Sequence, residues 1–238
     1  MELSPSPVVC GCGGGFPACG RCRSARGSKH ERRDGSGFGA YPPQTVNPPL
    51  TPELIVAAYC QGIFPMADEI DGEIGWYSPD PRAIFPLDAF HVPKSLAKTI
   101  RRGVFEVRID TAFEAVMRGC AERDETWISD EIVRSYCALH RAGLAHSVEA
   151  WHEGELTGGL YGVALGGAFM GESMFTRITD ASKVCLVALV ERLEERGFVL
   201  LDSQMPTEHL AKFGQITIPR ADYLRRLAAA LRLDRSFT

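Results

Sequence analysis

The segment from residue 146 to residue 197 constrains the fold of this 238-residue chain more than any other part of it. Apolar and polar side chains alternate in the first of three runs there, as they do in a half-buried strand, and short glycine-containing turns separate the runs. The runs are 146–151, 156–164 and 168–175, and the turns are Glu153-Gly154 and Gly166-Gly167. Three successive strands with turns this short predict an antiparallel meander. We expect Asp180 to cap a long helix after the meander and Gly197 to end it. Its core-facing side chains should be Val184, Val187, Leu189, Val190 and Leu193.

The rest of the chain from residue 50 onward predicts shorter elements of both kinds. Capping residues and apolar periodicity predict helices, and the Pro-rich, aromatic stretch 63–86 predicts an ordered loop with short strands. The expected helices are 51–61, 93–102, 110–121, 129–141, 207–213 and one from residue 221. Thr51, Asp110 and Ser129 are the expected caps of the helices that they begin. The expected strands are 105–109, 198–201 and 216–218. The fold class is therefore α+β, with a small N-terminal lobe before a domain built on a mixed, mainly antiparallel sheet.

Residues 1–49 differ in composition from the remainder of the chain. They hold 9 of the 24 Gly, 7 of the 15 Pro and 4 of the 8 Cys, and they show no periodic apolar face. We expect a flexible extension. Four thiolates could hold a zinc ion, but the two pairs, Cys10 with Cys12 and Cys19 with Cys22, lie closer together than in most structural zinc sites. The spacing favours a disordered leader or a misplaced start codon.

Composition excludes several classes of protein. No segment is long and apolar enough for a membrane span and the N-terminus lacks a secretory signal, so we expect a cytoplasmic protein. The net charge of −4 argues against a broad nucleic-acid-binding surface but allows a local basic stripe. The six His show no metal-ligand spacing, and the glycine pairs form neither a phosphate loop nor a dinucleotide fingerprint. We expect no metal, and kinase, NTPase and dehydrogenase functions are disfavoured.

Polar residues at a few positions contrast with their surroundings. Asp202 follows an apolar run at the carboxyl end of an expected strand, where ligand crevices of open sheets form, although an isolated Asp there is more often a cap. Glu172 lies inside an otherwise apolar strand, so its charge needs a partner or a ligand. Lys94, Lys98 and Arg101 share one side of a short helix, which suits phosphate contacts as well as it suits an ordinary solvated face.

Short motifs spread over residues 50–231 carry a resemblance to a known family. They are Gly62-Ile63-Phe64-Pro65-Met66, Trp76-Tyr77-Ser78-Pro79-Asp80-Pro81-Arg82, Thr126-Trp127-Ile128, Ala145-His146-Ser147-Val148-Glu149, Gly158-Gly159-Leu160-Tyr161-Gly162, Gly171-Glu172-Ser173-Met174-Phe175, Ala181-Ser182-Lys183, Asp202-Ser203-Gln204 and Ile218-Pro219-Arg220. Taken in this order, they resemble leucyl/phenylalanyl-tRNA–protein transferases. Residues 1–49 lie outside the resemblance.

The resemblance implies an aminoacyltransferase that moves Leu or Phe from Leu-tRNA or Phe-tRNA to proteins with an N-terminal Lys or Arg. That transfer marks the acceptor for degradation by the bacterial N-end rule pathway. The resemblance also implies a catalytic domain similar to the GNAT acyltransferase fold at residues 111–238, behind a small domain at residues 50–110. The family uses neither coenzyme A nor a metal as cofactor, and we expect a monomer with no membrane partner.

Carried onto matching positions, the family's catalytic relay falls on Asp202 and Gln204, with Asp202 polarising Gln204, which contacts the attacking amine or the ester. Whether Asp202 is a general base or an electrostatic and positioning residue stays open. Glu172 resembles a polar residue beside the aminoacyl ester, and Trp127 would stack on the terminal adenosine. The side chain of the transferred amino acid would bind Leu160, Phe169, Met174, Leu189 and Leu201, the last two assigned partly by their facing direction. Lys94, Lys98 and Arg101 remain the candidates for tRNA contacts.

Three other functions agree with parts of the pattern. A coenzyme-A-dependent N-acetyltransferase would need a glycine-containing phosphate loop before the long helix, and residues 176–183 lack one. A related transferase that adds leucine to acidic N-termini differs in its motifs. A non-catalytic tRNA-binding protein would keep the basic helix but would have no need of Asp202 and Gln204.

Overall fold

The computed structural model describes residues 49–68, 73–123 and 126–238, so the four cysteines of the N-terminal extension lie outside the described residues. The helices are α1 (Pro52–Tyr59), α2 (Lys94–Arg101), α3 (Phe113–Ala121), α4 (Asp130–Arg141), α5 (Ala181–Glu195), α6 (Glu208–Ala211) and α7 (Arg220–Ala230), with a 3-10 turn at Leu87–Ala89. The strands are β1 (Phe64–Ala67), β2 (Ile74–Tyr77), β3 (Arg82–Phe85), β4 (Glu106–Ile109), β5 (Ala145–His152), β6 (Glu155–Leu165), β7 (Ala168–Thr176), β8 (Leu200–Gln204) and β9 (Ile216–Ile218).

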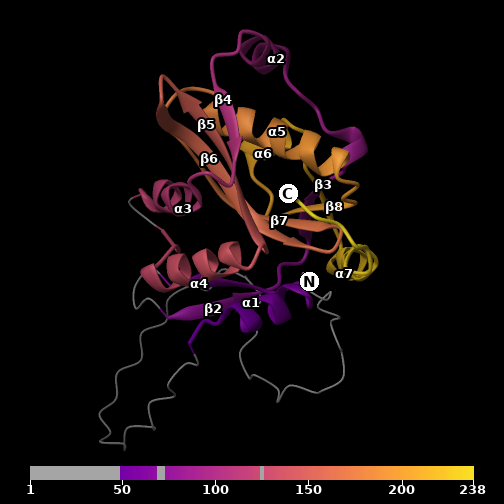
Figure 1. Cartoon of the computed structure of the whole chain (residues 1–238). Helices are drawn as coiled ribbons and strands as arrows, with labels where there is room; N and C mark the ends of the chain where they lie inside the picture. The colour runs from indigo at the N-terminus through magenta and orange to yellow at the C-terminus, as the bar shows by residue number, and fades with distance from the viewer. Residues whose placement is uncertain (1–48, 69–72, 124–125) are drawn as a thin grey trace, which may run out of the picture.

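A seven-stranded sheet of order β4-β5-β6-β7-β8-β3-β9 forms the centre of the molecule (Figure 1). Its neighbours are antiparallel except for β7 and β8, which run parallel. The predicted meander is confirmed as β5-β6-β7, and the long helix α5 follows it before the chain returns as β8. The α+β class with a mixed, mainly antiparallel sheet is therefore confirmed, in the order of elements that the resemblance to a GNAT-like domain implied.

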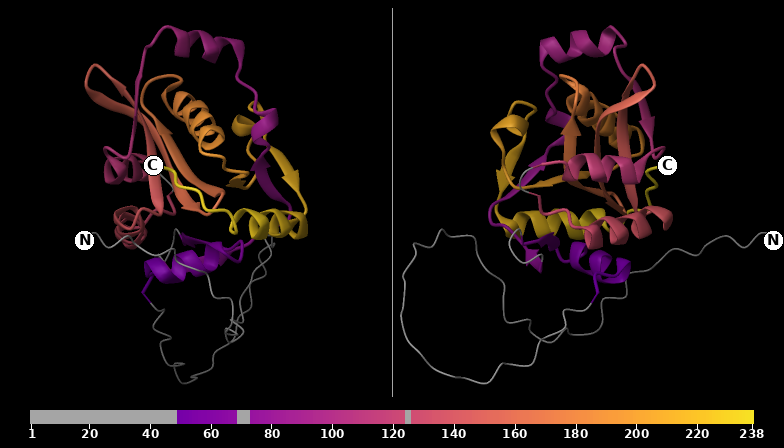
Figure 2. Two further views of the ribbon diagram at one scale, coloured as in Figure 1. Left: turned by 45° about the vertical axis from the view of Figure 1, so that its right-hand side comes forward. Right: turned by 90° about the vertical axis from the view of Figure 1, so that its left-hand side faces the viewer.

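Helices cover both faces of this sheet and divide the core in two. The first core lies on the side of α1, α3, α4 and α7, and the second lies under α5. The helix α2 lies at the opposite end of the molecule from α1 and the β1–β2 hairpin, as both views of Figure 2 show. The face predicted for α5 is confirmed, because Val184, Val187, Leu189, Val190 and Leu193 are all buried in the second core.

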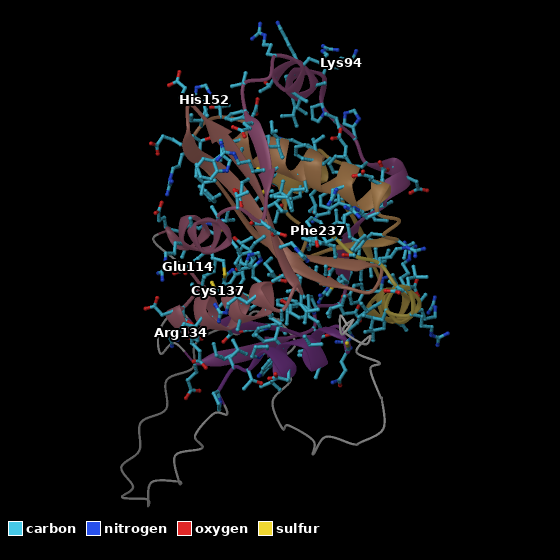
Figure 3. All side chains as sticks on the ribbon, in the orientation of Figure 1. Lys94, Glu114, Arg134, Cys137, His152 and Phe237 are labelled. Atoms are coloured by element: carbon cyan, nitrogen blue, oxygen red, sulfur yellow. The ribbon has the colours of Figure 1, made fainter. Side chains whose placement is uncertain are left out.

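The C-terminal segment also belongs to the second core. Phe237 is only 2% exposed, and its ring lies 5.2 Å from that of Phe169 and 6.3 Å from that of Phe198, between centroids. Figure 3 shows Phe237 in the interior, beside the sheet. Aromatic side chains packed in this way contribute their buried area and an additional ring–ring attraction.

Helix α3 is capped by a side chain from a neighbouring strand, so the prediction that Asp110 caps it was wrong. Asp110 has φ +59°, and its carboxylate binds Nδ1 of His146 at 2.7 Å instead. The backbone N–H groups of Thr111 and Ala112 donate to Oε1 of Glu149 on β5, at 2.9 and 2.7 Å. A carboxylate is favourable at this end of a helix because it satisfies free N–H groups and meets the positive end of the dipole.

Asp180 does not cap α5 through its side chain, which is a second correction. It adopts a left-handed conformation (φ +73°), and its carboxylate accepts hydrogen bonds from Nζ of Lys183 at 2.8 Å and from Oγ1 of Thr99 at 3.2 Å. The bond to Thr99 ties α2 to the start of α5. By contrast, the predicted caps Thr51 and Ser129 do accept hydrogen bonds from the helices that follow them.

Strand β8 begins and ends later than the predicted strand 198–201. Residues Leu200 to Gln204 are paired, so Asp202 lies within the strand and not after it. Strands β3 and β4, which fall in the predicted small domain 50–110, also pair within the seven-stranded sheet. The boundary at residue 110 stays a prediction.

Replacing Glu149 by Ala is expected to lower the free energy of unfolding by about 3 kcal/mol, because several donors lose a charged acceptor inside the protein. Glu149 is fully buried and also accepts hydrogen bonds from the side chains of Thr111, Ser147 and Trp151. Urea unfolding measures the loss. The control is Glu114→Ala, since Glu114 is exposed on α3 and solvent screens its ion pair with Arg118, which therefore contributes little stability. Equal losses in the two variants would contradict the cap.

Candidate active site

A buried ion pair joins β3 to β8. The Arg82 side chain donates from Nε to Oδ1 of Asp202 at 2.9 Å and from Nη2 to Oδ2 at 2.6 Å, and the two side chains are 1% and 0% exposed. The guanidinium carbon lies 4.8 Å from the ring centroid of Phe64 and 4.5 Å from that of Tyr223. Burial alone would lower the pKa of Arg82, but the hydrogen bonds and charge of Asp202 outweigh it and raise that pKa. The arginine therefore stays charged beside its carboxylate.

Every acceptor position of Asp202 is filled. The Tyr223 hydroxyl donates to Oδ2 at 2.8 Å, and the backbone N–H of Gln204 donates to Oδ1 at 2.8 Å. Together with the two bonds from Arg82, each carboxylate oxygen accepts two hydrogen bonds, which is about the capacity of the group. Asp202 can therefore act on a substrate only through the residues it holds.

Gln204 is the residue that Asp202 holds most directly. Its φ of +63° is a left-handed conformation that costs a non-glycine residue about 1–2 kcal/mol, and the hydrogen bond from its N–H to Asp202 stabilises it there. Its side chain donates from Nε2 to Oε1 of Glu172 at 3.1 Å. The structure thus brings Asp202, Gln204 and Glu172 together, as three of the predicted site residues.

Glu172 lies on a β-bulge where β7 separates from β8. The pairing of β7 with β6 passes from Gly171 directly to Ser173, so Glu172 has no partner across the strand. The pairing of β7 with β8 extends no further than Met170 and Asp202. The hydrogen bond between Gln204 and Glu172 therefore joins the two strands beyond their last backbone pair. Glu172 is half-buried, whereas Asp202 is fully buried, so Glu172 is the carboxylate that a substrate can reach.

Tyrosine side chains surround the carboxylate of Glu172. Tyr136 on α4 donates to Oε2 at 3.4 Å, and its hydroxyl lies 2.6 Å from that of Tyr59 on α1. Burial raises the pKa of Glu172 to about 7; hydrogen bonds from Tyr59 and Gln204 oppose this rise, and the charge of Asp202 adds to it. Burial also raises the pKa of Tyr59 and Tyr136 well above the ordinary value for tyrosine, with a further rise from the nearby Glu172, so both phenols stay protonated.

The residues predicted to bind the transferred side chain gather in the second core. Leu160, Phe169, Leu189 and Leu201 are buried there, and Met174 packs against them while remaining half-buried. Met174 is therefore the member of this set that solvent can reach. Trp127 lies apart from them, packed against the first core just before α4, where its backbone oxygen accepts a hydrogen bond from the N–H of Ala67 at 3.2 Å.

The predicted tRNA-binding residues lie at a distant part of the surface. Lys94, Lys98 and Arg101 are exposed on α2, which is anchored by its buried Leu96. Figure 3 shows Lys94 pointing away from the body of the molecule. Within the described ranges, none of the three has an ion-pair partner, so their charges are free to bind phosphate.

Sequence reasoning missed the residues that hold the site together. Arg82 stood in a quoted motif but received no role, and Tyr59 and Tyr136 fell on apolar helix faces that predict only core packing. The need of Glu172 for a partner was correctly inferred from its apolar strand. The same argument applied to Asp202 would have indicated a buried cation, although not which one.

No group of three or more His, Cys, Asp and Glu side chains suited to a metal ion is found in the described parts of the chain.

Two surface hollows, of about 570 and 300 Å³, are lined by residues other than the cluster of Asp202, Gln204 and Glu172. They are lined by Pro206, Thr207, Glu208, Ala211, Gln215, Ile216 and Thr217, and by Asp110–Ala115, Cys137, His140 and Arg141.

Comparison with known proteins gives consistent matches. The family model described as "Leucyl/phenylalanyl-tRNA protein transferase" matches residues 84–228, and the model for that family's N-terminal domain matches residues 49–80. The leucyl/phenylalanyl-tRNA–protein transferase of Rubrobacter xylanophilus is 64% identical over 79% of this chain and 98% of its own length. The enzyme of the same name from Herpetosiphon aurantiacus is 60% identical over the same shares.

A solved structure, described as L-PGS from Bacillus licheniformis, matches with a TM-score of 0.37 and 14% identity. The match covers 67% of this chain and 55% of that one, and a similarity this low supports no argument. The family match and the identities above 50% over nearly the full length of these relatives are sufficient without it. The chain belongs to the leucyl/phenylalanyl-tRNA–protein transferase family.

Proposed function

We propose that Gln204, held by Asp202 and facing Glu172, is the centre at which this chain transfers an amino acid. Family membership makes the chain an aminoacyltransferase that moves Leu or Phe from aminoacyl-tRNA to the N-terminus of proteins. The observation that supports this location is the hydrogen bond between Gln204 and Glu172, at 3.1 Å, where β7 and β8 separate. It presents a fixed amide and a reachable carboxylate at the same point.

The chemistry needs little more than orientation. An aminoacyl ester is already activated, so aminolysis requires a neutral amine, a fixed approach and stabilisation of the developing charge. Since Nε2 of Gln204 donates to Glu172, its amide oxygen is left to accept an N–H of the attacking amine. Asp202 acts as a positioning residue here, because its own acceptor positions are taken by Arg82, Tyr223 and the Gln204 backbone.

The side chain of the transferred Leu or Phe is assigned to the second core. Its members are Leu160, Phe169, Met174, Leu189 and Leu201. Met174 would form the entrance, because it is half-buried and its flexible thioether can adapt to a branched aliphatic or an aromatic group. Trp127 is assigned to stacking on the terminal adenosine, on the strength of the family resemblance.

Lys94, Lys98 and Arg101 are assigned to tRNA phosphates. Replacing all three by Ala is expected to weaken tRNA binding. It should also make the slope of log K against log salt concentration shallower, by the contribution of up to about three phosphate contacts, since each neutralised phosphate releases counterions. Filter binding at a series of salt concentrations measures the slope. The matched control replaces Arg225 and Arg226, which are exposed on α7, and should leave the slope unchanged. An unaltered slope in the triple variant would mean that α2 is an ordinary solvated helix that does not contact tRNA.

We assign as acceptors those proteins that begin with Lys or Arg. We also assign this protein to the cytoplasm and to the N-end rule pathway, and we expect it to act as a monomer. Within the described residues, no helix has the length and apolar character needed to cross a bilayer. One assay tests the function: labelled Leu-tRNA or Phe-tRNA is incubated with peptides that start with Arg, Lys or Asp. Label in the Arg and Lys peptides alone is expected. Label in the Asp peptide, or in none of them, would overturn the proposal.

A further inference from the structure

Glu172 differs from the other buried acids of this protein in its surroundings. Glu149 and Asp202 are fully buried and their oxygens are occupied by fixed donors. Glu172 is half-buried; Gln204 donates to its Oε1 at 3.1 Å, Tyr136 reaches its Oε2 at a longer 3.4 Å, and Tyr59 also hydrogen-bonds to it. A carboxylate has about four acceptor positions, so at this reachable place it retains capacity for a ligand.

A second observation points to a ligand at the same place. The hydroxyl of Tyr161 on β6 is completely buried and has no hydrogen-bond partner among the described residues. Burial raises the pKa of Tyr161 well above its ordinary value, and the nearby charge of Glu172 adds to this rise. The rings of Tyr136 and Tyr161 meet edge to face, 5.9 Å apart. Buried polar groups are almost always paired, so an orphaned hydroxyl beside a reachable acid indicates that the site is completed by a bound group.

The chemistry of this cluster fits an ammonium group. A carboxylate offers the opposite charge, a phenol oxygen accepts an N–H, and aromatic rings attract cations. We propose that Glu172 binds the α-ammonium group of the acceptor protein and takes its proton, so that the amine can attack the ester beside Gln204. This inference rests on the proposed function and adds to it a catalytic residue and the substrate group that it serves.

The proton balance is straightforward. The protonated amine has no free electron pair, and the Glu172 carboxylate removes one of its protons. The freed pair attacks the ester carbon, a C–N bond forms, and the bond from that carbon to the ribose oxygen breaks. A second proton of the nitrogen moves to the departing ribose oxygen, and Glu172 gives its proton to water. The products are an amide, a tRNA with a free hydroxyl and one released proton.

The acidity of the two groups is matched for this exchange. The pKa of Glu172 is raised to about 7, mainly by burial, and an α-amino group ordinarily titrates at about 7.7–8.0. Below pH 7 Glu172 is protonated and cannot accept a proton, and above it the carboxylate is ionised. The titratable and charged groups that face it are Tyr59 of α1, Tyr136 of α4, Tyr161 of β6, Arg82 of β3 and Asp202 of β8. The tyrosines and Arg82 keep their protonation states near pH 7, because their pKa values are raised.

The test is the single-turnover rate of transfer from Leu-tRNA or Phe-tRNA to an Arg-peptide, measured between pH 6 and 9 with the full-length protein. The wild-type rate should rise with an inflection near pH 7. At pH 7 the Glu172→Gln variant should be about 10²-fold slower, the usual contribution of a positioned base. That deficit should shrink at least tenfold by pH 9, because the amine is then neutral without help. A deficit that is the same at every pH, or no deficit at pH 7, would overturn the inference.

Two further variants keep the test independent of folding. Tyr59→Phe removes hydrogen bonding that lowers the pKa of Glu172, so its inflection should move to higher pH; an unmoved inflection would count against Glu172. Glu122→Gln changes an exposed carboxylate paired with Arg177 and should leave the whole profile unaltered. If the wild-type protein transfers nothing from either tRNA, the proposed function itself fails, which is a separate outcome.

Discussion

Replacing Arg82 by Met is expected to lower the free energy of unfolding by about 3–5 kcal/mol, the largest loss of stability that we expect from a single substitution in this protein. Asp202 is fully buried, and Arg82 supplies two of its four hydrogen bonds and the only charge within the described contacts that balances it. Without the guanidinium, that carboxylate would stay in the interior uncompensated. Urea unfolding, followed by circular dichroism, measures the change.

A double-mutant cycle separates the ion pair from simple packing. In the Arg82→Met, Asp202→Leu protein neither charge remains, so much of the lost stability should return, because apolar replacements of a buried pair are often nearly neutral. Transfer activity should not return with it. Arg118→Met is the control, since Arg118 is exposed and solvent screens its ion pair with Glu114, which therefore contributes little stability. If Arg82→Met were as mild as this control, the pair would not be holding β3 to β8.

Gln204→Ala is expected to slow single-turnover transfer by about 10²-fold or more while leaving the unfolding midpoint nearly unchanged. The side chain of Gln204 makes one hydrogen bond, to Glu172, so its removal disturbs the fold little. Asp202→Asn should slow transfer to a similar degree by a different route. All four groups that bind Asp202 are hydrogen-bond donors. In the Asn variant the amide NH2 group would replace one acceptor oxygen and would face donors with which it cannot pair.

The combination of the two substitutions shows whether they act as one unit. Since we propose that Asp202 works through Gln204, the double variant should be hardly slower than Gln204→Ala alone, a strongly non-additive result. The control is Gln215→Ala, since Gln215 binds Ser203 and the loop after β8 but lies outside the cluster. Additive losses would mean that Asp202 and Gln204 act separately, and near-normal transfer by the double variant would remove both from the mechanism.

The sequence predicted best those features that depend on near neighbours in the chain. The meander follows from strand-length runs separated by glycine turns, and the buried face of α5 follows from helical periodicity. Caps were predicted less well. Thr51 and Ser129 bind the turn that follows them, but α3 takes its cap from Glu149, nearly forty residues later. A cap from a distant strand leaves no signal beside the helix that it serves.

The candidate site shows the same division. Asp202 and Glu172 could be singled out because polar residues contrast with the apolar strands around them, and the family motifs added Gln204. Arg82, Tyr59 and Tyr136 could not, because an arginine in a Pro-rich loop and tyrosines on helix faces are ordinary surface and core residues until the sheet brings them together. Their roles depend on the pairing of β3 with β8, which is a property of the whole fold.

The ion pair between Arg82 and Asp202 also bears on the timing of synthesis, because 120 positions separate its two members. A ribosome that adds about 5–20 residues per second needs roughly 6–24 s to make that stretch. Throughout that interval β3 has neither of its neighbours, since β8 and β9 both come later, and Arg82 lacks its carboxylate partner. Gln204 cannot take up its held conformation until β8 has formed. With Gln204 as the proposed transfer centre, a nascent chain therefore cannot use aminoacyl-tRNA before β8 is in place.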